Sequence, residues 1–299
     1  MKILFASFRW LSLSLLGLVL VTYGGVCLYL YFWQTRLIFF PSPTIETTPK
    51  EFGLEYEDVW LPVKGGDSLN GETPAQLHGW WIPAQSTSRG VVLYLHGNGA
   101  NIGANVAQAE RFHRLGLSVL LIDYRGYGKS TGGFPSEAKV YEDATVAWNY
   151  LTQKRNISPQ RILLYGHSLG GAIATQLAVQ QPDAAGLIVQ CSFTSIREMT
   201  NRIRSYRLLP IDLVLTQRFE SIRKVPHLKM PVLFIHGMAD TEIPFDMSQT
   251  LYEAAPEPKR LWLVPDAGHN TVGDVAGAEY LRVVGQFVRE TVPDPAIID

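Results

Sequence analysis

The chain has 299 residues, 46% of them hydrophobic, which is long enough for one large domain with a single core and does not require two. Its 26 basic residues nearly balance its 27 acidic residues, so no global field favours binding to nucleic acid, and we expect no such partner. Cys27 and Cys191 lack the spacing of a zinc site, and we expect neither a bound metal nor a disulfide.

The first forty residues differ in composition from the rest. No charged residue occurs from Leu11 to Trp33, and as a helix this stretch would be roughly 34 Å long, enough to cross a bilayer core. It is longer than the apolar core of a cleavable signal peptide. It also ends in an aromatic cluster typical of a membrane interface, Tyr29, Tyr31, Phe32 and Trp33. The stretch predicts an uncleaved single-pass anchor through residues 11–33, with a cleaved signal and a buried soluble helix as alternatives.

Flanking charges predict the orientation of this anchor. Lys2 and Arg9 precede the apolar stretch and Arg36 follows it, so the positive-inside rule places the N-terminus in the cytoplasm. The folded domain would then lie on the non-cytoplasmic side. Prolines and threonines after the stretch predict a linker without a regular helix. We therefore expect an anchor over residues 1–40, a linker over 41–55 and a globular domain over 56–299.

The globular domain alternates strand-like and helix-like segments. Residues 56–63 and 75–83 carry β-formers separated by turn residues, which predicts an antiparallel pair near a sheet edge. Six short apolar runs follow, as expected for strands buried on both faces: 91–97, 118–124, 161–167, 186–192, 231–237 and 260–268. Helix-like segments lie between or after them: 103–115, 136–154, 169–181, 246–255 and 274–291. This alternation predicts a mostly parallel eight-stranded sheet flanked by helices, with function at the carboxyl ends of its strands.

The segment "LLYGHSLGG" places a serine between a strand and a helix. Such a tight reversal forces Ser168 into a strained backbone conformation, for which Gly166 and Gly170 leave room. The hydroxyl would lie at a helix start, where the Leu169 N–H could stabilise an oxyanion. Ser168 is therefore the candidate nucleophile, and the alternative is a helix N-cap serine.

A serine nucleophile needs a histidine base and a carboxylate that orients it. His269 follows the last predicted strand in a small loop, and Asp240 follows the preceding strand. Asp266 and Asp246 are alternatives for the carboxylate, more typical of a turn and of a helix start. Four other histidines next to strands are interpreted as structural: His78, His96, His167 and His236.

The segment "HGNGAN" follows the strand at 91–95 and brings glycines that let backbone N–H groups face a ligand. Asn98 lies where a second oxyanion donor is expected. A phosphate-binding loop is the competing interpretation of the nearby "DYRGYGKST" segment. The first glycine that such a loop requires would be at Asp123, so that interpretation fails.

Five motifs in order, "HGNGAN", "DYRGYGKS", "GHSLGG", "HGMAD" and "GHN", resemble the α/β-hydrolase superfamily over roughly residues 56–291. The anchor, "TRLIFFPSP" and "SFTSI" resemble more narrowly its membrane-anchored serine-hydrolase branch, which includes acyl-protein thioesterases that remove palmitate. The resemblance implies the α/β-hydrolase fold without a cofactor. It also implies a triad of Ser168, Asp240 and His269, with the backbone N–H groups of Asn98 and Leu169 as oxyanion donors.

Residues 192–230 are too long for a plain crossover and predict a small helical cap over the site. Eight basic residues against three acidic ones give this cap a charge of +5. Its basic residues form either a solvated face or, at Arg202, Arg204 and Arg207, a surface toward anionic headgroups or an anionic substrate. The apolar run 208–215 is either the core of the cap or the lip of an acyl pocket.

These features predict a monomeric, membrane-anchored serine hydrolase that cleaves a carboxylic ester or thioester of a small-molecule or lipid-like acyl substrate through an acyl-enzyme. Two alternatives stay open, a serine peptidase and a non-catalytic binding module on the same fold.

Overall fold

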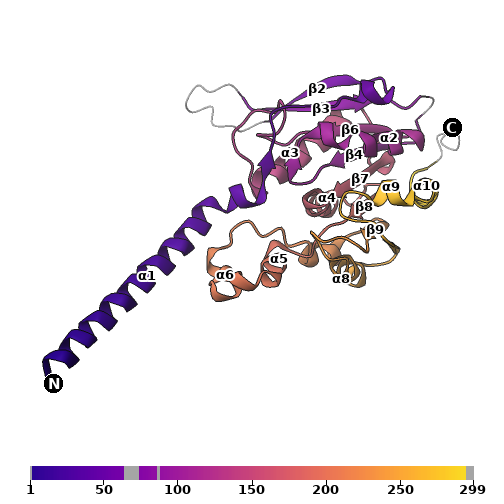
Figure 1. Ribbon diagram of the computed structural model, residues 1–299. Coiled ribbons are helices and arrows are strands. Elements are labelled where there is room, and N and C mark those ends of the chain that lie inside the picture. The colour runs from indigo at the N-terminus through magenta and orange to yellow at the C-terminus, as the bar shows by residue number, and fades with distance from the viewer. Residues whose placement is uncertain (1, 64–73, 86–87, 294–299) are drawn as a thin grey trace.

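The computed structural model describes residues 2–63, 74–85 and 88–293, with side chains from residue 9 onward (Figure 1). Eight strands form one sheet in the order β10-β9-β8-β7-β4-β6-β3-β2. Their bounds are β2 (Glu57–Pro62), β3 (Gln76–Ile82), β4 (Val91–Leu95), β6 (Ser118–Ile122), β7 (Ile162–His167), β8 (Gly186–Gln190), β9 (Val232–Gly237) and β10 (Lys259–Val264). Only the β2–β3 and β3–β6 pairs are antiparallel, which confirms the mostly parallel sheet with an antiparallel edge. The turn expected between β2 and β3 lies largely outside the described residues.

Helices cover both faces of the sheet. One apolar core lies under α3 (Glu137–Asn149), α4 (Leu169–Gln180) and α8 (Asp246–Ala254), and a second lies under α2 (Val106–Arg114) and α10 (Ala278–Thr291). The inner strands β4, β6, β7, β8 and β9 are buried on both faces, as their continuous apolar runs require. The prediction is wrong for β10, which is only partly buried because it lies at the edge of the sheet. The helix expected over 274–291 is instead two helices, α9 (Val272–Ala276) and α10, because Gly277 at φ 51° interrupts it.

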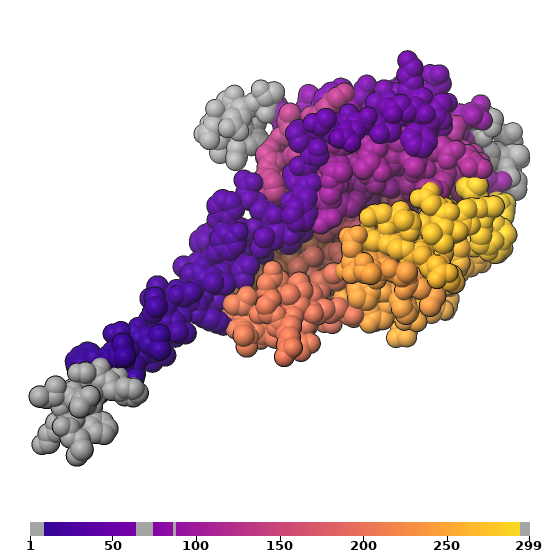
Figure 2. Space-filling model, in the orientation of Figure 1, coloured from indigo at the N-terminus to yellow at the C-terminus, as the bar shows by residue number. Residues whose placement is uncertain are grey.

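The segment between β8 and β9 forms a helical layer beside the N-terminal helix (Figures 1 and 2). It contains α5 (Ile196–Arg202), a 3₁₀ helix (Arg204–Leu208), α6 (Ile211–Val214), α7 (Ser221–Lys224) and a 3₁₀ helix (Val225–His227). Of the three arginines expected to form an anion-facing surface, Arg202 is already paired, because its Nη2 donates to Asp246 Oδ2 at 2.9 Å. We call residues 192–230 the cap.

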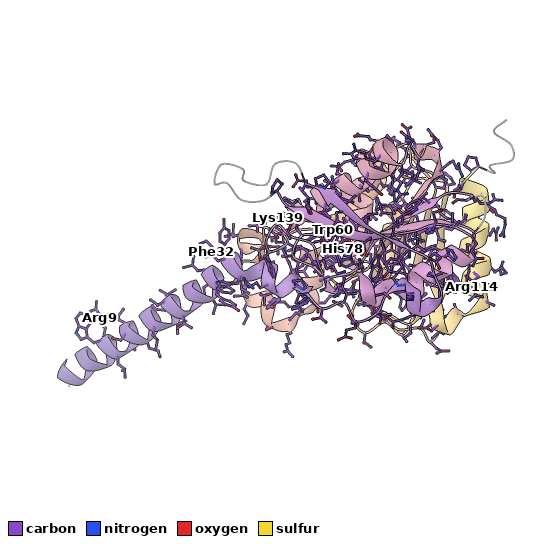
Figure 3. The ribbon with its side chains drawn as sticks, turned by 90° about the horizontal axis from the view of Figure 1, so that it is seen from above. Arg9, Phe32, Trp60, His78, Arg114 and Lys139 are labelled. Atoms are coloured by element: carbon purple, nitrogen blue, oxygen red, sulfur yellow. The ribbon has the colours of Figure 1, made fainter. Side chains whose placement is uncertain are left out.

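Helix α1 (Lys2–Ile38) extends away from the folded domain, and Figure 3 shows Arg9 and Phe32 along it. Within its portion Arg9–Ile38 an 18-residue window reaches a mean hydropathy of 2.0, so this portion is long and apolar enough to cross a membrane. The helix continues five residues past the predicted end of the span at Trp33. Its last turns lie against the cap, which stabilises helical structure there.

The segment expected to be a linker is bonded to the domain instead. After α1, the short strand β1 (Phe40–Pro41) pairs in parallel with β5 (Gly99–Ala100), just after β4. A 3₁₀ helix (Pro49–Phe52) follows. Phe39 and Leu54 are buried in the domain, with exposed fractions of 1% and 7%. The expected start of the domain at residue 56 is therefore too late, because apolar side chains among the prolines pack into both cores.

Candidate active site

Ser168 occupies the tight turn between β7 and α4. Its backbone, at φ 56° and ψ −121°, lies in a region that side chains rarely adopt. Two glycines make the turn possible: a Cβ on Gly166 would lie 2.2 Å from Gly170 O, and one on Gly170 would lie 2.0 Å from Leu95 O. The turn is also held by hydrogen bonds, since Ser168 N–H donates to the Gln190 carbonyl at 2.9 Å. The Ser168 side chain makes no capping hydrogen bond to α4, which argues against the N-cap alternative.

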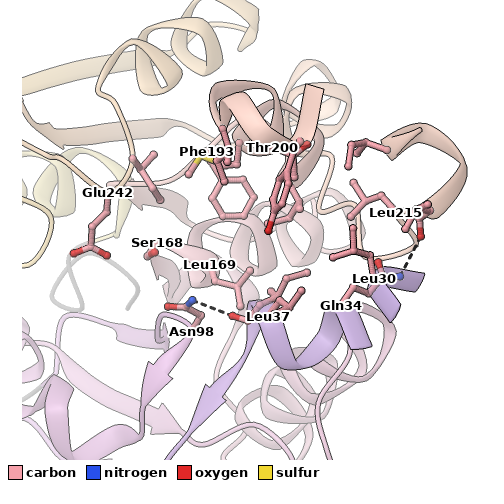
Figure 4. A pocket seen from close by; sticks show the side chains of 18 of the residues that line it. Leu30, Gln34, Leu37, Asn98, Ser168, Leu169, Phe193, Thr200, Leu215 and Glu242 are labelled. Atoms are coloured by element: carbon pink, nitrogen blue, oxygen red, sulfur yellow. Dashed lines mark hydrogen bonds between the residues drawn. The ribbon is translucent and has the colours of Figure 1, made fainter. Parts of the chain in front are cut away.

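Two backbone N–H groups lie beside this serine. A Cβ on Gly97 would lie 3.4 Å from Ser168 Cβ, so the loop after β4 passes close to the turn. Asn98 is fixed in this loop because its carbonyl accepts hydrogen bonds from Phe40 N–H at 2.8 Å and Tyr127 Oη at 2.6 Å. Among the described residues, the N–H groups of Asn98 and Leu169 have no hydrogen-bond partner. Both expected oxyanion donors are therefore free to bind a ligand, and Figure 4 shows the side chains of Asn98 and Leu169 next to Ser168.

Asp240 and His269 meet above the ends of β9 and β10. The two loops that carry them are joined by a hydrogen bond from Ala239 N–H to the Ala267 carbonyl at 2.9 Å. His269 Nδ1 lies 2.7 Å from Asp240 Oδ2, and since an ionised carboxylate only accepts, Nδ1 carries the proton. This contact leaves Nε2 of His269 free to act as a base.

The Asp240 carboxylate is held ionised by its surroundings. Its Oδ1 accepts from the N–H groups of Glu242 and Ile243, both at 2.9 Å, and its Oδ2 also lies 3.1 Å from His236 Nε2. Burial alone would raise the pKa of Asp240, but the hydrogen bonds from His236, His269 and Ile243 outweigh it and hold the pKa well below its usual range. The carboxylate can therefore orient the imidazole of His269 at any physiological pH.

The two competing carboxylates lie elsewhere. Asp266 is exposed at φ 59° in the turn after β10, consistent with a turn residue. Asp246 lies in the first turn of α8 and pairs with Arg202. Of the three, only Asp240 hydrogen-bonds to His269.

Ser168 and His269 border the same two cavities. No hydrogen bond joins Ser168 Oγ to the His269 ring among the residues that the structure describes. In enzymes without substrate such contacts are often long and tighten when substrate binds. The arrangement therefore contains a candidate nucleophile, a base and an orienting carboxylate. The contact between Ser168 and His269 would tighten when substrate binds.

Two histidines interpreted as structural support the pair. His167 Nε2 donates to the His269 carbonyl at 3.0 Å, and the two rings lie 4.9 Å apart. Burial, with a smaller effect from His269, lowers the pKa of His167 to about 4, so it stays neutral. His236 bridges the Ser248 hydroxyl at 2.6 Å and the Ile243 carbonyl at 2.8 Å as well as Asp240. Both histidines lie at strand ends next to predicted site residues, and this position is the signal that could have identified them as positioning residues.

An apolar cavity of about 330 Å³ extends from Ser168 beneath the cap (Figure 4). Residues of α1 and the cap form its walls, notably Leu30, Leu37, Ile196, Met199, Val214 and Leu215. The run 208–215 therefore contributes to the pocket rather than only to the core of the cap. A second, more polar cavity of about 500 Å³ lies on the other side of Ser168, bordered by Asn105, Gln108, Arg111, Glu242, Asn270 and Asp274.

Cys191 could join a metal-binding group with either His167 and His269 or His236 and Asp240. Burial raises the pKa of the Cys191 thiol to about 12, which disfavours the thiolate that a metal requires. The other members of both groups are already hydrogen-bonded among themselves. These donor sets do not fit a resident metal.

Comparison with known proteins places this geometry in context. A family model described as serine aminopeptidase, S33, matches residues 86–220. An uncharacterized protein of Mycobacterium tuberculosis (strain ATCC 25618 / H37Rv) is 35% identical over 284 residues, covering 95% of this chain and 97% of that protein. Lysophosphatidylserine lipase ABHD12 of Danio rerio is 34% identical over 222 residues, covering 68% of this chain and 56% of the lipase. The solved structure of Pyrococcus furiosus esterase Pf2001 has a TM-score of 0.70 at 22% identity, covers 86% of this chain and 98% of its own, and shares the fold.

Proposed function

The chain belongs to the α/β-hydrolase superfamily and is a serine hydrolase, and on that premise we propose that it is anchored in a membrane and cleaves an ester or thioester of a lipid-like acyl group. One observation carries the proposal. The His269–Asp240 pair lies beside Ser168 at the boundary between an apolar and a polar cavity, so a scissile bond there would separate an acyl chain from a polar leaving group.

In the proposed first step, Ser168 Oγ attacks the substrate carbonyl while His269 Nε2 takes the hydroxyl proton. Asp240 holds the imidazole through Nδ1 and stabilises its positive charge. The N–H groups of Asn98 and Leu169 bind the oxygen that becomes negative, and one such donor is worth about 10²–10³ in rate. His269 then gives its proton to the leaving oxygen or sulfur, and an acyl-enzyme forms.

In the second step, water attacks the acyl-enzyme carbonyl while His269 Nε2 takes a proton from the water. The tetrahedral intermediate collapses, the bond to Ser168 Oγ breaks, and the proton returns to the serine. The products are the free fatty acid and the enzyme in its starting state, so the cycle needs no cofactor.

A fluorophosphonate probe tests the nucleophile. We expect the full-length protein to be labelled and Ser168→Ala not to be labelled, with Ser192→Ala as the matched control because Ser192 supports the same turn without being the expected nucleophile. p-Nitrophenyl esters and acyl thioesters of increasing chain length then define the substrate class. Equal labelling of Ser168→Ala would exclude Ser168 as the nucleophile, and no labelling of the wild type would leave the non-catalytic binding module as the better account.

A serine aminopeptidase is the second candidate, favoured by the description of the matching family model and by Glu242. The Glu242 carboxylate borders both cavities and could bind the ammonium group of a peptide N-terminus. Aminoacyl p-nitroanilides separate the two candidates. Turnover of these amides that exceeds turnover of the esters and is lost in Glu242→Gln would favour the peptidase.

The proposed anchor runs through residues 11–33 with the N-terminus in the cytoplasm and the hydrolase domain on the other side. It is supported by the apolar surface of α1 and by Lys2 and Arg9 before it. A reporter fused to the C-terminus tests the orientation, and reporter activity confined to the cytoplasm would overturn it.

A further inference from the structure

We propose that the last turns of α1 and the cap together form an entry site through which a single acyl chain of a membrane lipid ester passes from the bilayer to Ser168. The inference rests on the proposed hydrolase function and adds to it the source and path of the substrate. It assigns to the membrane helix a part in substrate binding, besides anchoring.

The first observation is that α1 supplies one wall of the apolar cavity. Leu30, Leu37 and Ile38 border the same space as Ser168 and His269 (Figure 4). Cap side chains form the opposite wall. An acyl chain in this cavity would therefore contact the membrane helix directly, and the cavity would be open on one side without that helix.

The second observation is that α1 and the cap are fixed to each other by hydrogen bonds. Gln34 is 6% exposed, and its Oε1 accepts from the N–H groups of Thr216 at 2.8 Å and Gln217 at 2.9 Å. Its Nε2 donates to the Val214 carbonyl at 3.2 Å. Closer to the N-terminus, Tyr23 Oη donates to the Leu208 carbonyl at 2.9 Å. The contact between α1 and the cap therefore runs from Tyr23 to the end of the helix, about 22 Å at 1.5 Å per residue.

This contact carries the cap into the apolar zone around α1. Tyr23 lies within the uncharged stretch, and the residues around it on α1 are exposed and apolar. Leu208 and Leu213 of the cap are each 81% exposed, and they belong to the segment that contacts α1, whose own apolar side chains are also exposed. With α1 in a bilayer, both leucines lie at the depth of lipid chains. The rim of the apolar cavity is then in contact with the bilayer, which supplies the acyl chains.

The two cavities favour a single-chain lipid ester over a larger ligand. At about 330 Å³ the apolar cavity is near the low end of the ~300–1,000 Å³ range of small-molecule sites, which suits one chain better than two. The polar cavity of about 500 Å³ beyond Ser168 offers room for a headgroup. Exposed Arg204 and Arg207 adjoin Leu208 on one 3₁₀ helix, where their cationic ends could reach lipid phosphates while the leucine stays in the chains.

Larger side chains on the wall that α1 contributes to the apolar cavity test the role of α1 in substrate binding. We compare full-length wild type, Leu30→Trp and Leu37→Trp in nanodiscs, with Leu28→Trp as the matched control because Leu28 is on α1 but does not border the cavity. The readout is the ratio of kcat/KM for p-nitrophenyl palmitate to that for p-nitrophenyl butyrate. We expect this ratio to fall about tenfold or more in the two wall variants and to stay unchanged in the control.

Entry from the bilayer has a separate test. The double variant Leu208→Asp, Leu213→Asp should lose most activity on p-nitrophenyl palmitate held in phosphatidylcholine vesicles while butyrate in solution is still hydrolysed. Phe52→Asp, at an exposed apolar residue of the domain surface, is the control. Palmitoyl lysophosphatidylcholine and a palmitoyl-thioester peptide are assayed in the same vesicles. Hydrolysis of the peptide but not of the lipid would overturn the lipid ester as the occupant.

The failures can be told apart. Loss of all ester turnover and of Ser168 labelling in the wild type contradicts the proposed function itself. Normal turnover with an unchanged palmitate-to-butyrate ratio in both Leu30→Trp and Leu37→Trp contradicts only the part assigned to α1.

Discussion

Replacement of Gln34 by leucine should release the cap from helix α1. Leucine is similar in size to glutamine but lacks its amide group, whose Nε2 and Oε1 make three hydrogen bonds to the backbone of residues 214–217. At about 1 kcal/mol per hydrogen bond, the closed state of this segment loses ~3 kcal/mol of stability. The equilibrium constant for local opening of residues 214–217 should therefore rise roughly a hundredfold. Gln286→Leu is the matched control, since it makes the same change at an exposed glutamine on α10, whose side chain donates to Glu290.

Hydrogen exchange measured by mass spectrometry on the full-length protein in nanodiscs reads out this opening. We expect peptides that contain Thr216 and Gln217 to exchange about a hundredfold faster in Gln34→Leu and at the wild-type rate in Gln286→Leu, while peptides of β7 and β8 keep their protection in both. If exchange at residues 214–217 is the same in Gln34→Leu and in the wild type, the side chain of Gln34 does not hold the cap and our reasoning about this contact is wrong.

Three further predictions concern the site and its support. Asp240→Asn should lower kcat about 10⁴-fold with little change in KM, because the imidazole loses its orientation, and a loss below tenfold in steady-state assays would contradict the assigned role. Gly170→Ala should prevent folding because its Cβ would lie 2.0 Å from Leu95 O, whereas Gly99→Ala, with open space around its Cβ, should fold, as expression and melting curves would show. Burial lowers the pKa of His167 from its ordinary 6.5 to about 4. Between these pH values the unfolded chain binds more protons than the folded protein, so the stability of the folded protein falls as the pH drops from 6.5 toward 4. In His167→Gln the free energy of unfolding should change less with pH between these two values, by up to ~3 kcal/mol. An unchanged pH dependence in denaturation experiments would argue against a neutral His167 ring in the folded protein.

The sheet and the turn at Ser168 could be predicted because their signals are local. Continuous apolar runs mark strands buried on both faces, and glycines at 166 and 170 mark a tight reversal from a strand into a helix. The backbone atom that approaches Gly170 most closely nevertheless belongs to β4, at Leu95. The contact between Asp240 and His269 could be predicted for a related reason: parallel strands put their carboxyl ends at one edge, so residues after β9 and β10 meet there.

The supporting contacts could not be predicted, because they join segments far apart in the chain. Gln34 contacts residues about 180 positions away in the chain. The sequence around a single polar residue near the end of an apolar helix does not indicate which distant residues it will contact. His167 is similar, since only the folded loops show that its ring bonds to the His269 carbonyl. The exposed Leu208 and Leu213 were likewise indistinguishable in sequence from their neighbours that line the cavity.

The same long-range contacts connect α1, the proposed membrane anchor, to the proposed oxyanion site. Asn98 Nδ2 donates to the Ile38 carbonyl at 2.9 Å at the end of α1, and the Asn98 carbonyl accepts from Phe40 N–H two residues further on. The Asn98 N–H, proposed to bind the oxyanion, belongs to the same residue and is therefore oriented by the position of α1. A change in the tilt of α1 would move this donor as well as the cavity wall, whereas Leu169 on α4 would stay in place. Because oxyanion stabilisation depends on donors within about 2.7–3.1 Å of the oxygen, bilayer thickness should affect kcat as well as access of the substrate.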